Sequence, residues 1–485
     1  MNRGIGRVGV AVVVLLLVLV GQLTYLQVIH AQKLDDDPRN IRSVLRDINR
    51  DRGDIVSDDG EVLARTVRVD DETEFEYQRL YPLAGLTAQV VGYQSFVVGN
   101  VGIERSYNSQ LSGRAAELKS LGDVLRGKET TGTVVLHLRA DVQRAAKEAL
   151  GDQSGSVVVL DVRTGGVVAM YSNPTFDPQP LAGHETKAVN DYFTLLSNDP
   201  AKPNLPRAYR EIYPPGSTFK IVTSAVAFDT GTATPDTVYP TVSDLAIPLT
   251  SNLLKNFGGT ACGGTVFESF VVSCNSTFAK MGLELGDRFP PGLEGFGVEG
   301  EAPPLDVYPG AVRNTGLEGA DFETDTPQFA FAGIGQGTVA TSPLEMAMVA
   351  AAVGNGGVML EPRAAKEVRN AAGKVVATFG PRPWKTAMSP TTSQALNAMM
   401  RAVVERGTGT RAQLPGVTVA GKSGTAQTST GAPHAWFVAF APADTPRYAI
   451  AVIVENGGSN AGDNATGGVV AAPVAARVLG TALGP

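Results

Sequence analysis

A serine and a lysine three residues apart form the first pair in this sequence whose types and spacing could do chemistry. Ser217 and Lys220 lie in the stretch Tyr213-Pro-Pro-Gly-Ser-Thr-Phe-Lys220, which leads into the apolar run 221–228. We expect a buried helix here, and positions i and i+3 of a helix lie on one face. A serine hydroxyl needs a base to become a strong nucleophile, and a lysine is that base only when its pKa is lowered. The pair therefore predicts nucleophilic catalysis, although the spacing alone also occurs by chance.

Two more polar motifs follow Ser217. Ser273-Cys-Asn275 lies in a helix-rich middle region, and Lys422-Ser-Gly-Thr425 lies at the start of a late strand region. Each motif alone has a structural explanation, because such residues are common in turns, caps and hairpins. Their order and their contexts, a helix start, a loop among helices and a strand, are jointly much more specific.

The elements that must position these motifs follow from the hydrophobic pattern after residue 150. Strands are expected at both ends of this region and helices between them. The strands are 156–160, 167–171, 417–420, 436–441 and 448–455. The helices are 268–286, 342–353, 392–404 and 468–483. This order predicts one antiparallel sheet flanked by helices, and hence an α+β fold.

The composition excludes several classes of protein. The chain has 485 residues with 43% hydrophobic and 18% charged residues, which is typical of a globular protein with two or three domains. Its net charge of -7 makes nucleic acid an unexpected partner. The two cysteines lack a C-x-x-C arrangement, and the four histidines show no ligand spacing, so neither a metal site nor a cofactor is expected. These histidines are His30, His137, His184 and His434.

The N-terminus is expected to be a membrane anchor. Arg3 and Arg7 precede the apolar stretch 8–26, and about 20 helical residues span a hydrocarbon core of roughly 30 Å. No convincing signal-peptidase site follows, so we expect an uncleaved anchor over residues 8–28. The positive-inside rule then places residues 1–7 in the cytoplasm and the chain after about residue 30 outside. A buried core helix is the alternative, and it would not explain the basic flank.

The chain after the anchor divides by composition near residue 150. Residues 33–150 are richer in charge and are expected to form a mixed α/β domain, whereas residues 151–485 carry all three motifs. Two patterns in the first part are Arg52-Gly-Asp-Ile55 and Gly102-Ile-Glu-Arg-Ser-Tyr107. Neither contains a catalytic set, so we expect them to serve packing and turn formation.

The three polar motifs resemble the active-site motifs of the penicillin-binding protein and serine β-lactamase superfamily. Gly335-Gln-Gly337 with Ser342-Pro-Leu-Glu345 resembles the family's G-Q-G and T-P-L-Q segment. His434-Ala-Trp-Phe437 with Ala441-Pro442 is similar to its H-A-W-F and A-P strand. The two early patterns resemble the pedestal motifs of class B members. The resemblance covers almost the whole chain.

The chain resembles the penicillin-binding protein A type, a monofunctional D,D-transpeptidase. The resemblance lies in its size, its single expected span and the absence of an added glycosyltransferase or repeat region. The resemblance implies a dimerisation-type pedestal over residues 33–150 and a transpeptidase domain over residues 151–485. It implies four kinds of partner: peptidoglycan stem peptides ending in D-Ala-D-Ala, β-lactams, the membrane, and cell-wall synthase or division proteins.

The resemblance also implies roles for the residues that would react. Ser217 would attack the carbonyl between the two terminal D-alanines and form an acyl-enzyme. Lys220 would be the base, kept neutral by burial and by the charge of Lys422. Ser273 would relay a proton to the leaving amine, and Asn275 would hold a backbone amide of the substrate.

The strand motif is implied to bind the end of the substrate. Lys422, Ser423 and Thr425 would engage the terminal carboxylate through charge-assisted hydrogen bonds. Gly424 would let the strand approach the substrate closely, because it has no Cβ. The backbone N–H groups of Ser217 and Thr425 would hold the oxyanion.

Other interpretations stay open at this stage. Cys262 and Cys274 would face an oxidising exterior, so they form either a disulfide that ties down the Ser273 loop or two buried thiols. His434 beside Trp436 is expected to pack and not to act as a base. The alternative functions are a D,D-carboxypeptidase, a class D-like β-lactamase, a β-lactam sensor and an inactive division scaffold. The anchor and pedestal disfavour the β-lactamase, and a short cytoplasmic tail disfavours the sensor.

Overall fold

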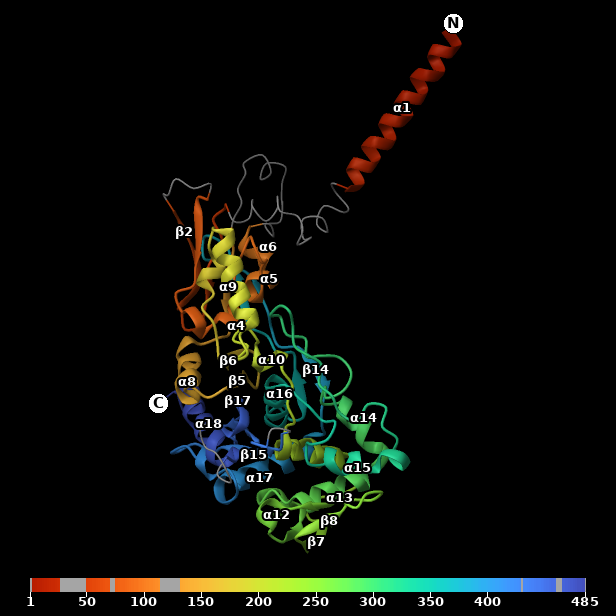
Figure 1. The fold of residues 1–485 in the computed structure, drawn as a ribbon, viewed down its shortest axis with the longest axis vertical. Helices are drawn as coiled ribbons and strands as arrows, with labels where there is room; N and C mark the ends of the chain where they lie inside the picture. The colour runs from red at the N-terminus through yellow and green to blue at the C-terminus, as the bar shows by residue number, and fades with distance from the viewer. Residues whose placement is uncertain are drawn as a thin grey trace.

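The computed structural model describes residues 2–26, 49–69, 75–113, 131–428, 431–458 and 465–484. Helix α1 (Asn2–Thr24) lies apart from the folded body (Figure 1). Its segment Gly6–Thr24 has a mean hydropathy of 2.3 and is long and apolar enough to cross a membrane. The expected end of the anchor at residue 28, the expected start of the pedestal at residue 33, and His30 lie outside the described residues.

The main sheet has five strands in the order β15-β16-β17-β5-β6, and every neighbouring pair is antiparallel. The strands are β5 (Gly155–Asp161), β6 (Val167–Asn173), β15 (Ala420–Ala426), β16 (His434–Ala441) and β17 (Tyr448–Val454). Two strands thus come from the start of this region and three from its end, which confirms the predicted sheet. The strand expected at 417–420 begins only at Ala420, so the Lys422 motif lies inside β15 and not after a strand.

Helices cover both faces of this sheet, which explains why its strands are apolar throughout. Val157 and Val159 of β5 pack in one core with α8 (Ala140–Leu150) and α18 (Gly467–Leu483). Val158 and Leu160 point the other way, into a larger core with α16 (Pro343–Gly354). Successive side chains of a strand point to opposite faces, so both sets can be buried only in a sheet between two helical layers.

The sheet's larger core continues into a helical part at the end of the molecule opposite α1 (Figure 1). Its helices are α11 (Lys220–Asp229), α12 (Val266–Val271), α13 (Asn275–Leu285), α14 (Phe289–Glu294), α15 (Phe322–Ala332) and α17 (Pro390–Arg406). Two small antiparallel sheets cap it: β7 (Val238–Val242) with β10 (Cys262–Thr265), and β8 (Asp244–Ala246) with β9 (Leu253–Lys255). The single helix expected at 268–286 is wrong, because the chain turns at Ser273, whose φ is 62°. A left-handed residue cannot continue an α-helix.

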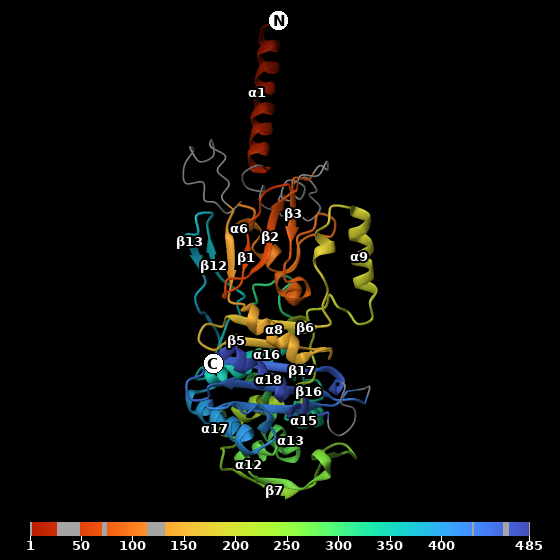
Figure 2. The same cartoon turned by 90° about the vertical axis from the view of Figure 1, so that its left-hand side faces the viewer.

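A second, six-stranded sheet lies between α1 and the main sheet, in the order β13-β12-β4-β1-β2-β3 (Figure 2). Four strands come from the early chain: β1 (Ile55–Val56), β2 (Val62–Arg68), β3 (Tyr77–Leu80) and β4 (Thr133–Leu136). The other two, β12 (Ala365–Arg369) and β13 (Val375–Thr378), come from late in the chain. Late strands therefore complete a sheet that begins in the early chain, across the expected division at residue 150.

The shorter elements connect these layers. The helices are α4 (Ala88–Val91), α5 (Gly102–Ser106), α6 (Asn108–Leu111), α9 (Thr186–Asn198) and α10 (Arg207–Arg210). The strands are β11 (Val358–Leu360) and β14 (Pro383–Thr386), which pair with each other.

The two early sequence patterns meet in a buried ion network. Glu104 is fully buried and accepts hydrogen bonds from Nε of Arg52 and Nε of Arg79, both at 2.7 Å. Burial alone would raise the pKa of Glu104, but Arg79 and Arg52 hold it below its usual value. The expectation of packing and turn formation was therefore incomplete. Charged partners also join the two patterns, and removing one member of such a network leaves an uncompensated buried charge.

Candidate active site

Ser217 lies in a 3₁₀ turn, Gly216–Phe219, directly before α11. Gly216 has a φ of 55°, and its N–H donates to the carbonyl of Gly335 at 2.9 Å. A Cβ on Gly335 would lie 2.2 Å from the carbonyl oxygen of Gly216, so only glycine fits this contact. Residues three apart eclipse in a 3₁₀ turn, which supports the expectation that Ser217 and Lys220 share a face. The side chain of Ser217 is half-buried at the wall of a cleft.

Lys220 and Lys422 both reach the hydroxyl of Ser273, and both are fully buried. Nζ of Lys422 lies 2.8 Å from Oγ of Ser273, and Nζ of Lys220 lies 3.3 Å from it. Lys220 also donates to the carbonyl of Ser273 at 2.7 Å and to Oδ1 of Asn275 at 2.9 Å. The three sequence motifs thus meet at Ser273 in the folded chain.

The protonation of this lysine pair follows from its surroundings. Burial lowers the pKa of Lys220 far below its usual value, and the nearby charge of Lys422 lowers it further. Burial lowers the pKa of Lys422 to about 7. Of the described residues, no carboxylate forms an ion pair with either amine. Lys220 can therefore be neutral at physiological pH, as a base for Ser217 must be.

Two contacts hold the Ser273 loop in a strained conformation. Ser273 is a non-glycine residue at φ 62°, and such residues persist only where the surrounding structure enforces them. Cys274 forms a disulfide with Cys262 of β10, so the structure has the bonded form of the two alternatives. In addition, Oδ1 of Asn256 accepts the N–H of Ser276 at 2.8 Å. Asn256 could not be predicted from the sequence, because an isolated asparagine carries no signal of this contact.

The Lys422 motif lies on β15, an edge strand of the main sheet. Ser423 and Thr425 line the cleft, and Oγ of Ser423 lies 2.6 Å from Oγ1 of Thr408. A Cβ on Gly424 would lie 2.9 Å from the carbonyl oxygen of Pro215. The missing side chain leaves room for the turn that carries Ser217.

Two aromatic contacts join this sheet to the Ser217 turn. The ring of Trp436 is fully buried, and its Nε1 donates to the carbonyl of Pro214 at 3.0 Å. Nδ1 of His434 accepts the backbone N–H of Asn456, and its ring lies edge-on to Tyr213. Burial lowers the pKa of His434. Both side chains are occupied in packing and positioning, in line with the prediction.

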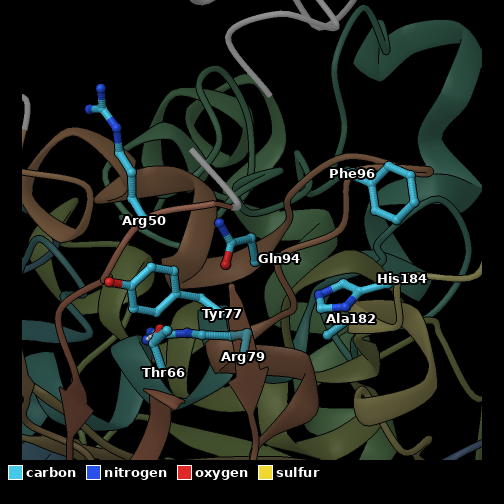
Figure 3. Close-up of a pocket in the computed structure, with 8 residues that line it drawn as sticks. All are labelled: Arg50, Thr66, Tyr77, Arg79, Gln94, Phe96, Ala182 and His184. Carbon is cyan, nitrogen blue, oxygen red and sulfur yellow. Dashed lines mark hydrogen bonds between the residues drawn. The ribbon is translucent and has the colours of Figure 1, made fainter. Parts of the chain in front are cut away.

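The cleft in front of Ser217 has a volume of about 970 Å³. Its walls include residues of all three motifs: Ser217, Ser273, Asn275, Ser423 and Thr425. By contrast, a hollow in the N-terminal sheet region, beside Arg79 and Tyr77, measures only about 10 Å³ (Figure 3). The hollow has room for about one water molecule, so the large cleft is the candidate active site.

Residues 155–480 match the penicillin-binding protein transpeptidase domain, and residues 52–135 match the penicillin-binding protein A dimerisation domain. The chain belongs to the penicillin-binding protein transpeptidases. Within this family it is of the penicillin-binding protein A type, and its activity is that of a serine acyltransferase. The serine, the lysine pair and the cleft therefore lie in the matched catalytic domain.

Two curated members of the family are similar over almost their whole length. Peptidoglycan D,D-transpeptidase PbpA of Mycolicibacterium smegmatis is 36% identical over 477 residues, which cover 94% of each chain. The protein of that name from Mycobacterium tuberculosis is 33% identical over 480 residues, again 94% of each chain.

Solved structures of this family are similar in fold. The ceftriaxone acyl-enzyme complex of penicillin-binding protein A from M. tuberculosis has a TM-score of 0.83 and 32% identity, covering 91% of this chain and 100% of that chain. The penicillin G acyl-enzyme complex of that protein has a TM-score of 0.80 and 32% identity, covering 90% and 100%.

Proposed function

We propose that this penicillin-binding protein cross-links peptidoglycan stem peptides through an acyl-enzyme on Ser217, with release of D-alanine. The observation that carries the proposal is the placement of Ser217 on a large cleft, three residues before a fully buried lysine of lowered pKa. The name of the similar curated proteins, peptidoglycan D,D-transpeptidase, supports the substrate class.

The acylation step uses the lysine pair and the hydroxyl between it. Neutral Lys220 accepts the proton of Ser217 as Oγ attacks the carbonyl carbon of the penultimate D-alanine. The C–N bond to the terminal D-alanine then breaks, and the leaving amine receives a proton through Ser273. The N–H groups of Ser217 and Thr425 hold the oxyanion, a contribution of about 3 kcal/mol for each donor.

The edge of β15 binds the donor peptide in this proposal. An edge strand has unpaired backbone groups that can accept an extended peptide as a further strand. Ser423 and Thr425 line the cleft and bind the terminal carboxylate, while the positive charge of Lys422 lies behind them. Asn275 holds a backbone amide of the donor from the opposite wall.

The second step transfers the acyl group to an amine of a neighbouring stem peptide. β-Lactams resemble the D-Ala-D-Ala end and acylate Ser217 in the same way. The acyl-enzyme structures of the M. tuberculosis protein support this part. A D,D-carboxypeptidase or a β-lactamase would instead pass the acyl group to water.

One assay separates these functions. The protein is incubated with a stem pentapeptide and an acceptor amine, and the products are analysed by mass spectrometry. We expect free D-alanine together with an amide-linked dimer. Release of D-alanine with hydrolysed peptide alone would identify a carboxypeptidase, and rapid turnover of penicillin would identify a β-lactamase.

We further propose that α1 anchors the protein with residues 1–7 in the cytoplasm and residues 33–485 outside. The disulfide in the catalytic region supports an oxidising location. Residues 8–28 are then the anchor, 33–150 a pedestal for division or cell-wall synthase proteins, and 151–485 the transpeptidase domain.

The growth of a bacterial strain that carries Ser217→Ala separates a catalytic role in division from the role of an inactive scaffold. A Ser217→Ala strain that divides normally would favour the scaffold.

A further inference from the structure

One rim of the cleft carries exposed apolar side chains beside Asn275. Leu253 is 57% exposed, Phe257 63% and Val272 54%, and all three line the cleft. Single exposed apolar side chains are ordinary on a protein surface, but a group of them around a cleft marks a binding surface. We call these three residues the apolar rim.

Lys255 lies between two residues of the apolar rim in the chain, Leu253 and Phe257, and lines the same cleft. Strand β9 has an exposed, buried, exposed pattern, so Leu253 and Lys255 project from the same face. Of the described residues that line the cleft, Lys255 is the one with a charged side chain, and none is acidic. The rim therefore offers an apolar surface with a single positive charge.

The backbone holds Lys255 directly beside the catalytic region. The carbonyl oxygen of Lys255 accepts Nδ2 of Asn275 at 3.2 Å. The next residue, Asn256, is 4% exposed and is fixed at both ends of its amide: Oδ1 accepts the N–H of Ser276, and Nδ2 donates to the carbonyl of Val242. The position of Lys255 relative to Asn275 is thus set by two anchored neighbours.

One acidic residue faces Lys255 across the small sheet. Asp244 of β8 is the cross-strand partner of Lys255. Its carboxylate accepts the hydroxyl of Ser243 at 3.0 Å, and it forms no ion pair with Lys255 in the described structure. The ammonium group of Lys255 is therefore available to a ligand, although Asp244 attracts it from the side.

We propose that the apolar rim and Lys255 form a specificity subsite for an aliphatic side chain that ends in a carboxylate, carried by the acyl donor of Ser217. The aliphatic part packs on Leu253, Phe257 and Val272, and the carboxylate pairs with Lys255. This inference rests on the proposed function, because it assigns the subsite to the donor whose amide Asn275 holds. A donor whose chain ends in a neutral amide loses the ion pair but keeps the apolar contact.

The test uses two penicillins with the same reacting ring. Their acylamino chains are four methylenes long and end either in a carboxylate or in a primary amide. We expect the wild-type protein to react about fivefold faster with the carboxylate compound, the upper range for an exposed ion pair. The preference should shrink at high ionic strength, because salt screens exposed charges. The readout is the second-order rate constant of acylation.

Matched variants assign the preference to Lys255. Lys255→Gln should slow only the carboxylate compound and bring the ratio to about one. Asp244→Asn should increase the ratio, since it removes the competing charge. Lys374→Gln, an exposed lysine in the turn after β12, is the control and should leave the ratio unchanged. Phe257→Ala should slow both compounds, because both chains pack on the rim.

Equal rates in the wild-type protein would overturn the subsite, as would a preference that survives in Lys255→Gln. An equal slowing of both compounds by Lys255→Gln would also overturn it, because the lysine would then act on acylation in general. Failure of both penicillins to acylate the wild-type protein would instead contradict the proposed function.

Discussion

Two buried amines that share one hydroxyl are the central feature at the scale of residues. Lys220 and Lys422 approach Oγ of Ser273 at 3.3 and 2.8 Å. Two protonated amines at these distances would repel each other strongly, because both lysine side chains are fully buried. The pair therefore holds fewer than two protons near neutral pH, and it titrates as a unit. This arrangement supports the proposal that Lys220 is the base for Ser217.

Replacing Lys220 should stop acylation without unfolding the protein. Lys220→Ala removes the base and a costly buried amine together, so we expect acylation by a fluorescent penicillin to fall at least ~100-fold. The melting temperature should change by only a few degrees. Lys280→Ala, on the exposed side of α13, is the control and should label normally. Full labelling of Lys220→Ala would remove Lys220 from the role of base.

Glu345 is a second buried group whose protonation matters. It is fully buried at the start of α16, and Oε2 accepts Nδ2 of Asn314 at 3.0 Å. Burial raises its pKa from 4.5 to about 8, so the folded protein holds this carboxyl protonated at neutral pH. The unfolded chain has already released the proton there. Stability is therefore lost progressively as pH rises from about 4.5 to about 8.

Glu345→Gln should remove this pH-dependent loss. The variant places an uncharged amide where the T-P-L-Q pattern has glutamine. We expect it to raise the free energy of unfolding by about 1–3 kcal/mol at pH 8.5 and to have little effect at pH 4.5. Urea unfolding at the two pH values measures the difference. Glu323→Gln, an exposed residue of α15, serves as control. Equal effects at both pH values would show that Glu345 is ionised in the folded state.

At the scale of elements, hydrophobic pattern predicted most helices and strands of the catalytic region but not the break between α12 and α13. Residues 268–286 have a continuous helical pattern, whereas the chain turns at Ser273. The disulfide and Asn256 enforce that turn, and both act through residues distant in sequence. Such contacts override local propensity, so a helical pattern alone could not reveal the break.

The disulfide should support both stability and acylation. Cys262 and Cys274 are the only cysteines of the chain, so a reductant acts on this bond alone. A bridge over 12 residues stabilises by about 3 kcal/mol in the chain-entropy model. We expect reduction to lower the melting temperature and to slow acylation, because the strained Ser273 loop loses one support. Thiol titration confirms reduction. A reduced protein with unchanged melting temperature and acylation rate would show that other contacts suffice.

At the scale of the whole molecule, one sheet joins parts of the chain that sequence separates. β12, from late in the chain, pairs with β4, and β13 pairs with β12, so residues 365–378 complete the N-terminal sheet. Short, partly polar strands such as these carry little signal of their partner, because strand pairing depends on tertiary context. The motifs identified the family from sequence, and they predict the catalytic set. They contained no information on the pairing of these late strands with the early sheet.

The shared sheet should make the two parts depend on each other. A fragment of residues 151–485 exposes the edge of β12 that otherwise pairs with β4. We expect it to melt ~5 °C or more below a fragment of residues 49–485 and to aggregate more readily. Calorimetry and light scattering measure both effects. Equal melting temperatures would show that the catalytic region folds independently of the early strands.

The most direct test of the whole account is the site of the penicillin adduct. The intact protein is labelled with penicillin, digested, and mapped by mass spectrometry. We predict a single adduct on the peptide that contains Ser217, and its complete loss in Ser217→Ala. An adduct on another residue, or labelling that persists in Ser217→Ala, would contradict Ser217 as the nucleophile.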